Sequence, residues 1–256
     1  SDLPKYLANR IVRPRAHADR LRARAQVDPA RTRARYAGGM QDPAPETVPE
    51  PTGKPSEPAP HGVGPWPGEW PIEAHYDPEL LEHGDTRNVI DRYRYWRMEA
   101  IVAELDTRRH AFHVAIENWQ HDMNIGSIVR SANAFLADTV HIVGKRRWNR
   151  RGAMVTDRYQ HVVHHETVEA FAEWAAAEGI PIIAVDNVAG AVPVDQAELP
   201  QRCVLLFGQE GPGLSDEALA AAAGHVEITQ YGSTRSINAS AAAAVIMYEW
   251  CRRHAG

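Results

Sequence analysis

The stretch LLFGQEGPGLS, residues 205–215, decides the fold of this chain. Its first three residues are large and apolar, as in a buried strand, and the glycines Gly208, Gly211 and Gly213 permit positive φ angles and close approach of a ligand to the backbone. Ser215 is followed by two carboxylates and can cap a helix. The stretch therefore predicts a strand, a tight turn and a helix. In isolation, a turn that binds nothing is the favoured interpretation.

From residue 108 onward, apolar strands alternate with helical stretches, which is typical of an α/β domain with a parallel sheet. The expected strands are residues 111–117, 139–143, 181–185, 203–207 and 225–228. The expected helices are residues 124–135, residues 168–178 between a Thr167 cap and Gly179, a helix from Ser215 to Gly224, and a final helix from Ser236 through Ala241 to Arg253.

The glycine-rich turn does not match the familiar nucleotide-binding motifs. A P-loop requires a lysine after its second glycine, and this turn has none and carries Glu210, which would repel a phosphate. The dinucleotide fingerprint is absent too, because the glycines have the wrong spacing and come late in the chain. The sequence therefore excludes a P-loop at this turn.

The amino-acid composition changes twice before the α/β region begins. Residues 1–37 hold ten basic and three acidic residues, a net charge of +7. Because the whole chain has a net charge of −5, the remaining residues carry −12. Such an arginine-rich arm is typical either of a polyanion contact or of a solvated tail. Residues 38–71 are rich in proline and are expected to form an extended linker. Residues 72–107 are expected to form a helical lead-in, with Val89, Ile90, Tyr93, Ile101, Val102 and Leu105 as packing positions.

Composition indicates an ordinary globular protein. Of the 256 residues, 44% are hydrophobic, and no apolar run approaches the roughly 20 residues that cross a bilayer. The N-terminus has no apolar core like that of a signal peptide. The two cysteines, Cys203 and Cys251, are too few for a disulfide framework. A cytoplasmic location is therefore expected.

Three separated segments together resemble one protein family. NIGSIVRSANAF (residues 124–135), LFGQEGPGLS (residues 206–215) and SINAS (residues 236–240) are similar, in order and spacing, to the three motifs of the SpoU (TrmH-like) class of SPOUT RNA methyltransferases. The resemblance covers roughly residues 108–256, so that region is expected to be the methyltransferase domain. The arm, the linker and the lead-in lie outside the resemblance.

The resemblance implies a fold, a reaction and a set of residues. The fold would be a SPOUT domain with a deep C-terminal trefoil knot, and the protein would be a homodimer. It would transfer a methyl group from S-adenosylmethionine to a ribose 2′-hydroxyl of rRNA or tRNA. The backbone at Gly208, Ile228 and Ile237 would meet the cofactor. The catalytic set would be Asn124, Arg130, Glu210, Ser236 and Asn238, with Glu210 orienting either Arg130 or the ribose.

Each of these residues has an ordinary structural alternative. Asn124, Ser236 and Glu210 could each cap a helix, and Arg130 could form a surface salt bridge. The presence of the whole set favours an enzyme over a catalytically inactive RNA-binding protein with the same fold.

A basic cluster adds an RNA contact to the prediction. Cations hold phosphates and an aromatic ring can stack on an unpaired base, so the cluster around Trp148 favours RNA over a solvated loop. Its members are Lys145, Arg146, Arg147, Arg150 and Arg151. The nearby histidines His161, His164 and His165 lack a matching set of metal ligands, so no metal site is predicted.

Overall fold

Strand β6 (Val204–Phe207), which begins the glycine-rich stretch, lies at the centre of a seven-stranded sheet in the computed structural model. The structure describes residues 62–120 and 124–255. All strand pairs are parallel, and the order is β3-β2-β1-β6-β4-β7-β5. The other strands are β1 (His113–Asn118), β2 (Thr139–Gly144), β3 (His161–His165), β4 (Ile182–Val185), β5 (Val192–Pro193) and β7 (Gly224–Glu227).

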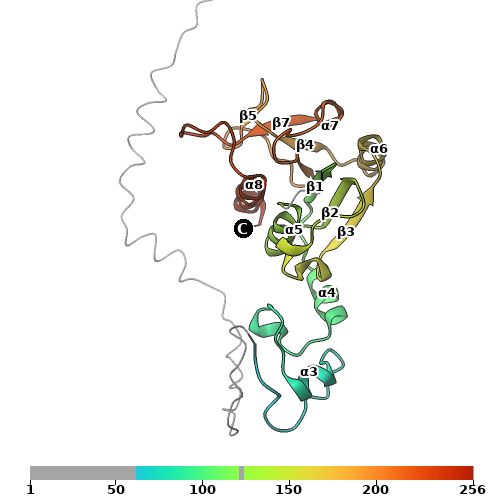
Figure 1. Cartoon of the computed structure of the whole chain (residues 1–256). Coiled ribbons are helices and arrows are strands. Elements are labelled where there is room, and N and C mark those ends of the chain that lie inside the picture. The colour runs from blue at the N-terminus through green and yellow to red at the C-terminus, as the bar shows by residue number, and fades with distance from the viewer. Residues whose placement is uncertain (1–61, 121–123, 256) are drawn as a thin grey trace, which may run out of the picture. The chain divides into compact units, whose positions relative to one another are not determined.

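Helices cover both faces of this sheet (Figure 1). On one face, α5 (Asn124–Ala134) and α8 (Ala239–His254) pack in a core that includes Ile128, Ile246 and Trp250. On the other face, α6 (Val168–Glu178) and α7 (Asp216–Ala221) pack in a second core. Burial on both faces explains why the central strands are almost wholly apolar. The expected α/β fold with a parallel sheet is confirmed.

The helix boundaries confirm one prediction and correct two others. Thr167 caps α6 by accepting a hydrogen bond from the Ala170 amide, and Gly179 ends the helix at φ 64°. Helix α7 ends at Ala221 rather than at Gly224, because Gly224 already pairs with β4 as the first residue of β7. Helix α8 begins after Asn238, not at Ser236, since the Asn238 side chain is the cap.

The predicted helical lead-in is helical over about half of its length. It contains α3 (Pro78–His83), the 3-10 turn η1 (Asp91–Tyr93) and α4 (Met98–Asp106). Tyr93, Ile101 and Leu105 are buried as expected, but Ile90 is 62% exposed and does not pack. The buried carboxylate of Asp85 holds the irregular part by accepting bonds from the Arg87 guanidinium and the Tyr95 amide.

Some predictions fall on residues that the structure does not describe. The basic arm of residues 1–37 and residues 38–61 of the linker lie outside the described residues. Within the described ranges, no helix has both the length and the apolar character needed to cross a membrane.

Candidate active site

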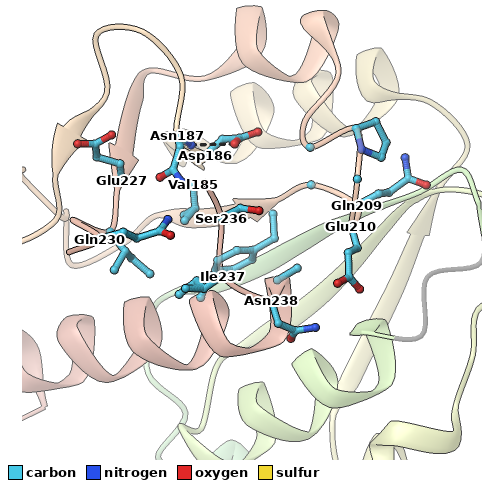
Figure 2. Close-up of a pocket in the computed structure, with 18 residues that line it drawn as sticks. Val185, Asp186, Asn187, Gln209, Glu210, Glu227, Gln230, Ser236, Ile237 and Asn238 are labelled. Carbon is cyan, nitrogen blue, oxygen red and sulfur yellow. Dashed lines mark hydrogen bonds between the residues drawn. The ribbon is translucent and has the colours of Figure 1, made fainter. Parts of the chain in front are cut away.

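A pocket of about 260 Å³ opens where strands β4, β6 and β7 end. Parallel strands present their carboxyl ends on one edge of a sheet, which is where open α/β sheets bind ligands. Figure 2 shows that the glycine-rich turn forms one wall and that the segment before α8 forms another. Gly208, Glu210, Ile228, Ser236, Ile237 and Asn238 all line it.

The glycine-rich turn is closed on itself by backbone hydrogen bonds and leaves no room for a side chain at residue 208. The backbones of Gln209 and Gly213 exchange two hydrogen bonds, of 3.2 and 3.1 Å. Gly211 and Gly213 have φ angles of 98° and 75°, which glycine adopts without strain. Residue 208 must be glycine for a different reason. A Cβ there would lie only 2.3 Å from the Gly213 carbonyl carbon, because the two ends of the turn approach each other closely.

Buried polar side chains fix the turn to the sheet. Glu117 on β1 is fully buried and accepts hydrogen bonds from the Ser215 amide and hydroxyl, both at 2.8 Å. Asp186, which follows β4, accepts from the Leu214 amide at 3.0 Å. The Gln209 side-chain oxygen accepts from the amides of Trp119 and Gln120 and so ties the turn to the segment before α5. The turn is therefore held from three sides before any ligand binds.

A chain of hydrogen bonds joins the three sequence segments at the edge of the pocket. The side-chain nitrogen Nδ2 of Asn124 donates to Glu210 Oε2 at 2.7 Å. The side-chain nitrogen Nδ2 of Asn238 donates to Asn124 Oδ1 at 2.8 Å. Asn238 Oδ1 in turn accepts from the Ser240 amide and hydroxyl at the start of α8. The orientation of all three side chains is thereby fixed.

Arg130 stands apart from the other predicted catalytic residues. It is exposed on α5 and does not line the pocket. The reason is helical geometry: six residues along a helix turn the side chain by about 240°, so Arg130 and Asn124 occupy different faces of α5. The structure brings together Asn124, Glu210, Ser236 and Asn238, and leaves Arg130 on the surface.

Four polar residues of the pocket were not predicted from the sequence. Asp186 and Asn187 follow β4, and Glu227 and Gln230 lie at the end of β7 and just after it. Figure 2 shows all four on the side of the pocket away from Glu210. These residues could have been identified from their place in the sequence, because polar residues that follow parallel strands gather at the same edge of the sheet. No family motif is needed for that inference.

The predicted basic cluster forms an exposed loop beside the start of α5. Its five cations are all exposed, and the Arg150 guanidinium lies over the Trp148 ring at 5.3 Å and pairs with Asp157 at 3.3 Å. The loop contacts α5 closely, since a Cβ on Gly126 would lie 2.7 Å from the Ala153 nitrogen. The cluster thus lies on the same helix end as Asn124.

The three neighbouring histidines have separate partners. His161 contacts Asp106, His164 contacts the Gly144 carbonyl, and His165 contacts His141, at 2.7 to 2.9 Å. Within residues 62–120 and 124–255, no group of three or more histidine, cysteine or carboxylate side chains is arranged to hold a metal ion.

Comparisons with known proteins agree with this geometry. The sequence model of the SpoU rRNA Methylase family matches residues 111–248. The tRNA (guanosine(18)-2′-O)-methyltransferase of Escherichia coli is 28% identical over 156 residues, which are 60% of this chain and 68% of that protein. The chain is also similar to the SpoU methyltransferase AviRb from Streptomyces viridochromogenes in complex with AdoMet, at 26% identity and a TM-score of 0.51.

A further solved relative is the AdoMet-bound rRNA methyltransferase from Sinorhizobium meliloti, with 25% identity and a TM-score of 0.52. The similarity to each of the two solved structures covers 59% of this chain and 60% of theirs. The family match spans more than half of the chain and contains all three segments that meet at the pocket. The chain therefore belongs to the SpoU rRNA methylase family.

Proposed function

We propose that this protein transfers a methyl group from S-adenosylmethionine to a ribose 2′-hydroxyl of rRNA or tRNA. The observation that carries the proposal is the hydrogen-bonded chain of Glu210, Asn124 and Asn238 at the edge of the pocket. This chain holds polar groups rigidly beside a backbone-lined cavity, which is what alignment of two reactants requires. The names of the relatives give the same reaction class.

The pocket suits S-adenosylmethionine. Gly208 lines the pocket from the glycine-rich turn, and Ile228 and Ile237 line it as well. Asp186 and Glu227 place carboxylates in the lining, where they complement the positive charges of the sulfonium and ammonium groups. When bound, the cofactor supplies an electrophilic methyl group. AviRb and the S. meliloti enzyme, both similar to this chain, are bound to AdoMet in their solved structures.

The residues at the edge of the pocket would position the RNA ribose. Glu210, Asn124 and Asn238 fix its orientation with neutral amides and one carboxylate, and correct alignment is worth on the order of 7–11 kcal/mol. Ser236 adds a hydroxyl on the same side. Arg130, which lies outside this pocket, grips the phosphate of the target nucleotide, and the proton of the hydroxyl leaves to that phosphate or to water. The exposed cluster of residues 145–151 holds the flanking phosphates.

The reaction is tested with labelled S-adenosylmethionine and either total rRNA or total tRNA. Label is expected in one pool, and label in neither would refute the proposal. Arg130→Ala should abolish transfer and leave cofactor affinity nearly unchanged. The matched control is Arg202→Ala. Arg202 is also an exposed arginine, but it pairs with Glu178 and lies just before the amino-terminal end of β6. A large loss of cofactor binding in Arg130→Ala would contradict its assigned role.

We also propose that the C-terminal part of the chain forms the trefoil knot of the family. Support comes from the end of α8, where three side chains bond to the segment between β5 and β6. Trp250 donates to the Pro200 carbonyl, His254 contacts the Leu199 carbonyl at 2.8 Å, and Arg253 donates to the Ala197 carbonyl at 2.6 Å. Close contact between the last helix and this earlier segment is expected of a threaded chain.

A homodimer is the expected assembly. Ala241, Val245 and Tyr248 lie at helical spacing on α8 and are all exposed, and Tyr248 is 61% exposed. An apolar stripe on an exposed helix face favours contact with a second copy of the chain. The molar mass in solution, measured by light scattering, should be twice that of the chain, and Tyr248→Arg should halve it.

The domain organisation and location are proposed on the same basis. Residues 108–256 would form the methyltransferase domain, preceded by the lead-in (72–107), the linker (38–71) and the basic arm (1–37). A cytoplasmic location fits an rRNA or tRNA substrate and the free cysteines Cys203 and Cys251.

A further inference from the structure

A second pocket, of about 240 Å³, lies between the lead-in and the far end of α5. The lead-in contributes Asn88, Ile90 and Tyr93, and the methylase domain contributes residues that include Arg108, Asn133 and Tyr159. The lead-in residues precede the family match, which starts at residue 111. The pocket is therefore a feature of this chain rather than of the part that it shares with the family.

Half of the pocket lining is aliphatic, and the other half consists of two tyrosines, two asparagines, a threonine and one cation, Arg108. Arg108 is held in place by Glu104 at 3.1 Å and by the Tyr93 hydroxyl at 2.7 Å, and its side chain is 46% exposed. None of the described residues that line the pocket is a carboxylate. Because the charged group of the lining is the Arg108 cation, the pocket favours a ligand with exposed acceptor atoms.

Asn133 supplies an unused acceptor. Its Oδ1 is buried and has no hydrogen-bond partner among the residues that the structure describes. A buried acceptor without a donor costs about 1–3 kcal/mol, which an N–H group of a ligand would recover. Asn88 lines the same pocket, is exposed, and offers a second amide at its rim. Together the two amides can read both donors and acceptors, as the edge of a nucleobase requires.

The position of the pocket connects it to the candidate active site. Helix α5 runs from Asn124 at one pocket to Asn133 at the other, and nine residues of helix span about 14 Å. The 3-10 turn η3 (Thr156–Arg158), which follows the basic cluster, contributes Thr156 to the same lining. The exposed cations of residues 145–151 thus lie on the loop that leads from one pocket to the other.

We propose that this second pocket binds an unpaired nucleobase of the substrate RNA, at a nucleotide other than the one that is methylated. The inference rests on the proposed function. An unstacked base offers a hydrogen-bonding edge to the two asparagines and packs against the small exposed parts of Tyr93 and Tyr159, which are 5% and 7% exposed, while Arg108 contacts its acceptor atoms or its phosphate. The lead-in would then select the RNA, and the methylase domain would modify it.

The test compares two single charge changes on the same exposed loop of the full-length protein. Asn88→Asp places a carboxylate at the rim of the pocket with almost no change in shape. Thr86→Asp places the same charge two residues away, where it does not line the pocket. Asn88→Asp should raise KM for RNA about tenfold, the effect of roughly 1.4 kcal/mol, and Thr86→Asp less than about twofold. Both variants should bind S-adenosylmethionine like the parent protein.

Crosslinking separates this inference from the reaction itself. Random-sequence RNA that contains 4-thiouridine is irradiated with the protein, and the crosslinked peptides are identified by mass spectrometry. Crosslinks at Tyr93 or Tyr159 that Asn88→Asp removes and Thr86→Asp retains support the pocket, even if no methyl group is transferred. Equal KM values for the two variants, or crosslinks confined to residues 145–151, would overturn it. Loss of transfer with these crosslinks intact would contradict the proposed reaction alone.

Discussion

Replacing His141 by glutamine should make the protein more resistant to acid. His141 on β2 is 1% exposed and lies in a row of three histidines that crosses three strands. Its Nε2 is 3.2 Å from His113 Nδ1 on β1, and its Nδ1 is 2.9 Å from His165 Nε2 on β3. Burial, together with the two neighbouring histidines, lowers the pKa of His141 from 6.5 to about 3. His141 therefore stays neutral in the folded protein at any moderately acidic pH.

The magnitude follows from proton linkage. Above pH 6.5 both the folded and the unfolded chain hold a neutral His141, and the group has no effect. As the pH falls from 6.5 towards 3, the unfolded chain binds a proton that the folded protein refuses, so the free energy of unfolding decreases. With these two pKa values the loss is about 1.4 kcal/mol per pH unit and reaches about 2 kcal/mol at pH 5.

The measurement is urea unfolding, followed by far-UV circular dichroism at about pH 7.5 and about pH 5. Glutamine keeps a donor and an acceptor for His113 and His165 but has no titratable group. Its free energy of unfolding should fall about 2 kcal/mol less than that of the parent protein between the two pH values. His141→Phe, which removes the hydrogen bonds as well, should show the same reduced pH dependence from a lower starting stability. An equal loss in all three proteins would refute the buried neutral state of His141.

Three more outcomes are expected. Gly208→Ala should abolish cofactor binding, measured by calorimetry, because its Cβ meets backbone, whereas Gly232→Ala should bind normally because a Cβ there meets nothing within 4 Å. Glu117→Ala should destabilise the protein by about 1–3 kcal/mol in urea unfolding, since it leaves the Ser215 donors unpaired; a smaller effect would mean that water replaces the carboxylate. Deletion of residues 1–37 should weaken RNA binding and flatten its salt dependence; an unchanged slope of log affinity against log salt would show that the arm does not contact phosphate.

The fold was largely predictable because the sheet is buried on both faces. All five expected strands exist, each within two residues of its predicted ends. The two missed strands lack the apolar signal for physical reasons. Strand β3 (His161–His165) contains three histidines and lies at the edge of the sheet, and β5 (Val192–Pro193) has only two residues. Short or polar edge strands carry little hydrophobic pattern.

The sequence predicted which residues form the candidate site, but not which of them form hydrogen bonds with one another. The side chains of Asn124, Glu210 and Asn238 were singled out, but nothing in the sequence said that they bond to one another. Likewise, Asn238 rather than Ser236 caps α8, because only its side chain reaches the first helical amides. Local pattern identifies such residues, whereas their pairing depends on how distant segments are brought together.

The hydrogen bond between Asn238 and Asn124 has a consequence for synthesis. It joins residues 114 positions apart, and Asn238 caps helix α8, which follows every strand of the sheet along the chain. A nascent chain that has not yet released α8 from the ribosome therefore has the earlier segments but an incomplete set of positioning groups. On the proposed role of the basic loop, RNA that meets such a chain would be bound without being modified. Competence for the reaction should thus arise in one late step of biogenesis rather than gradually.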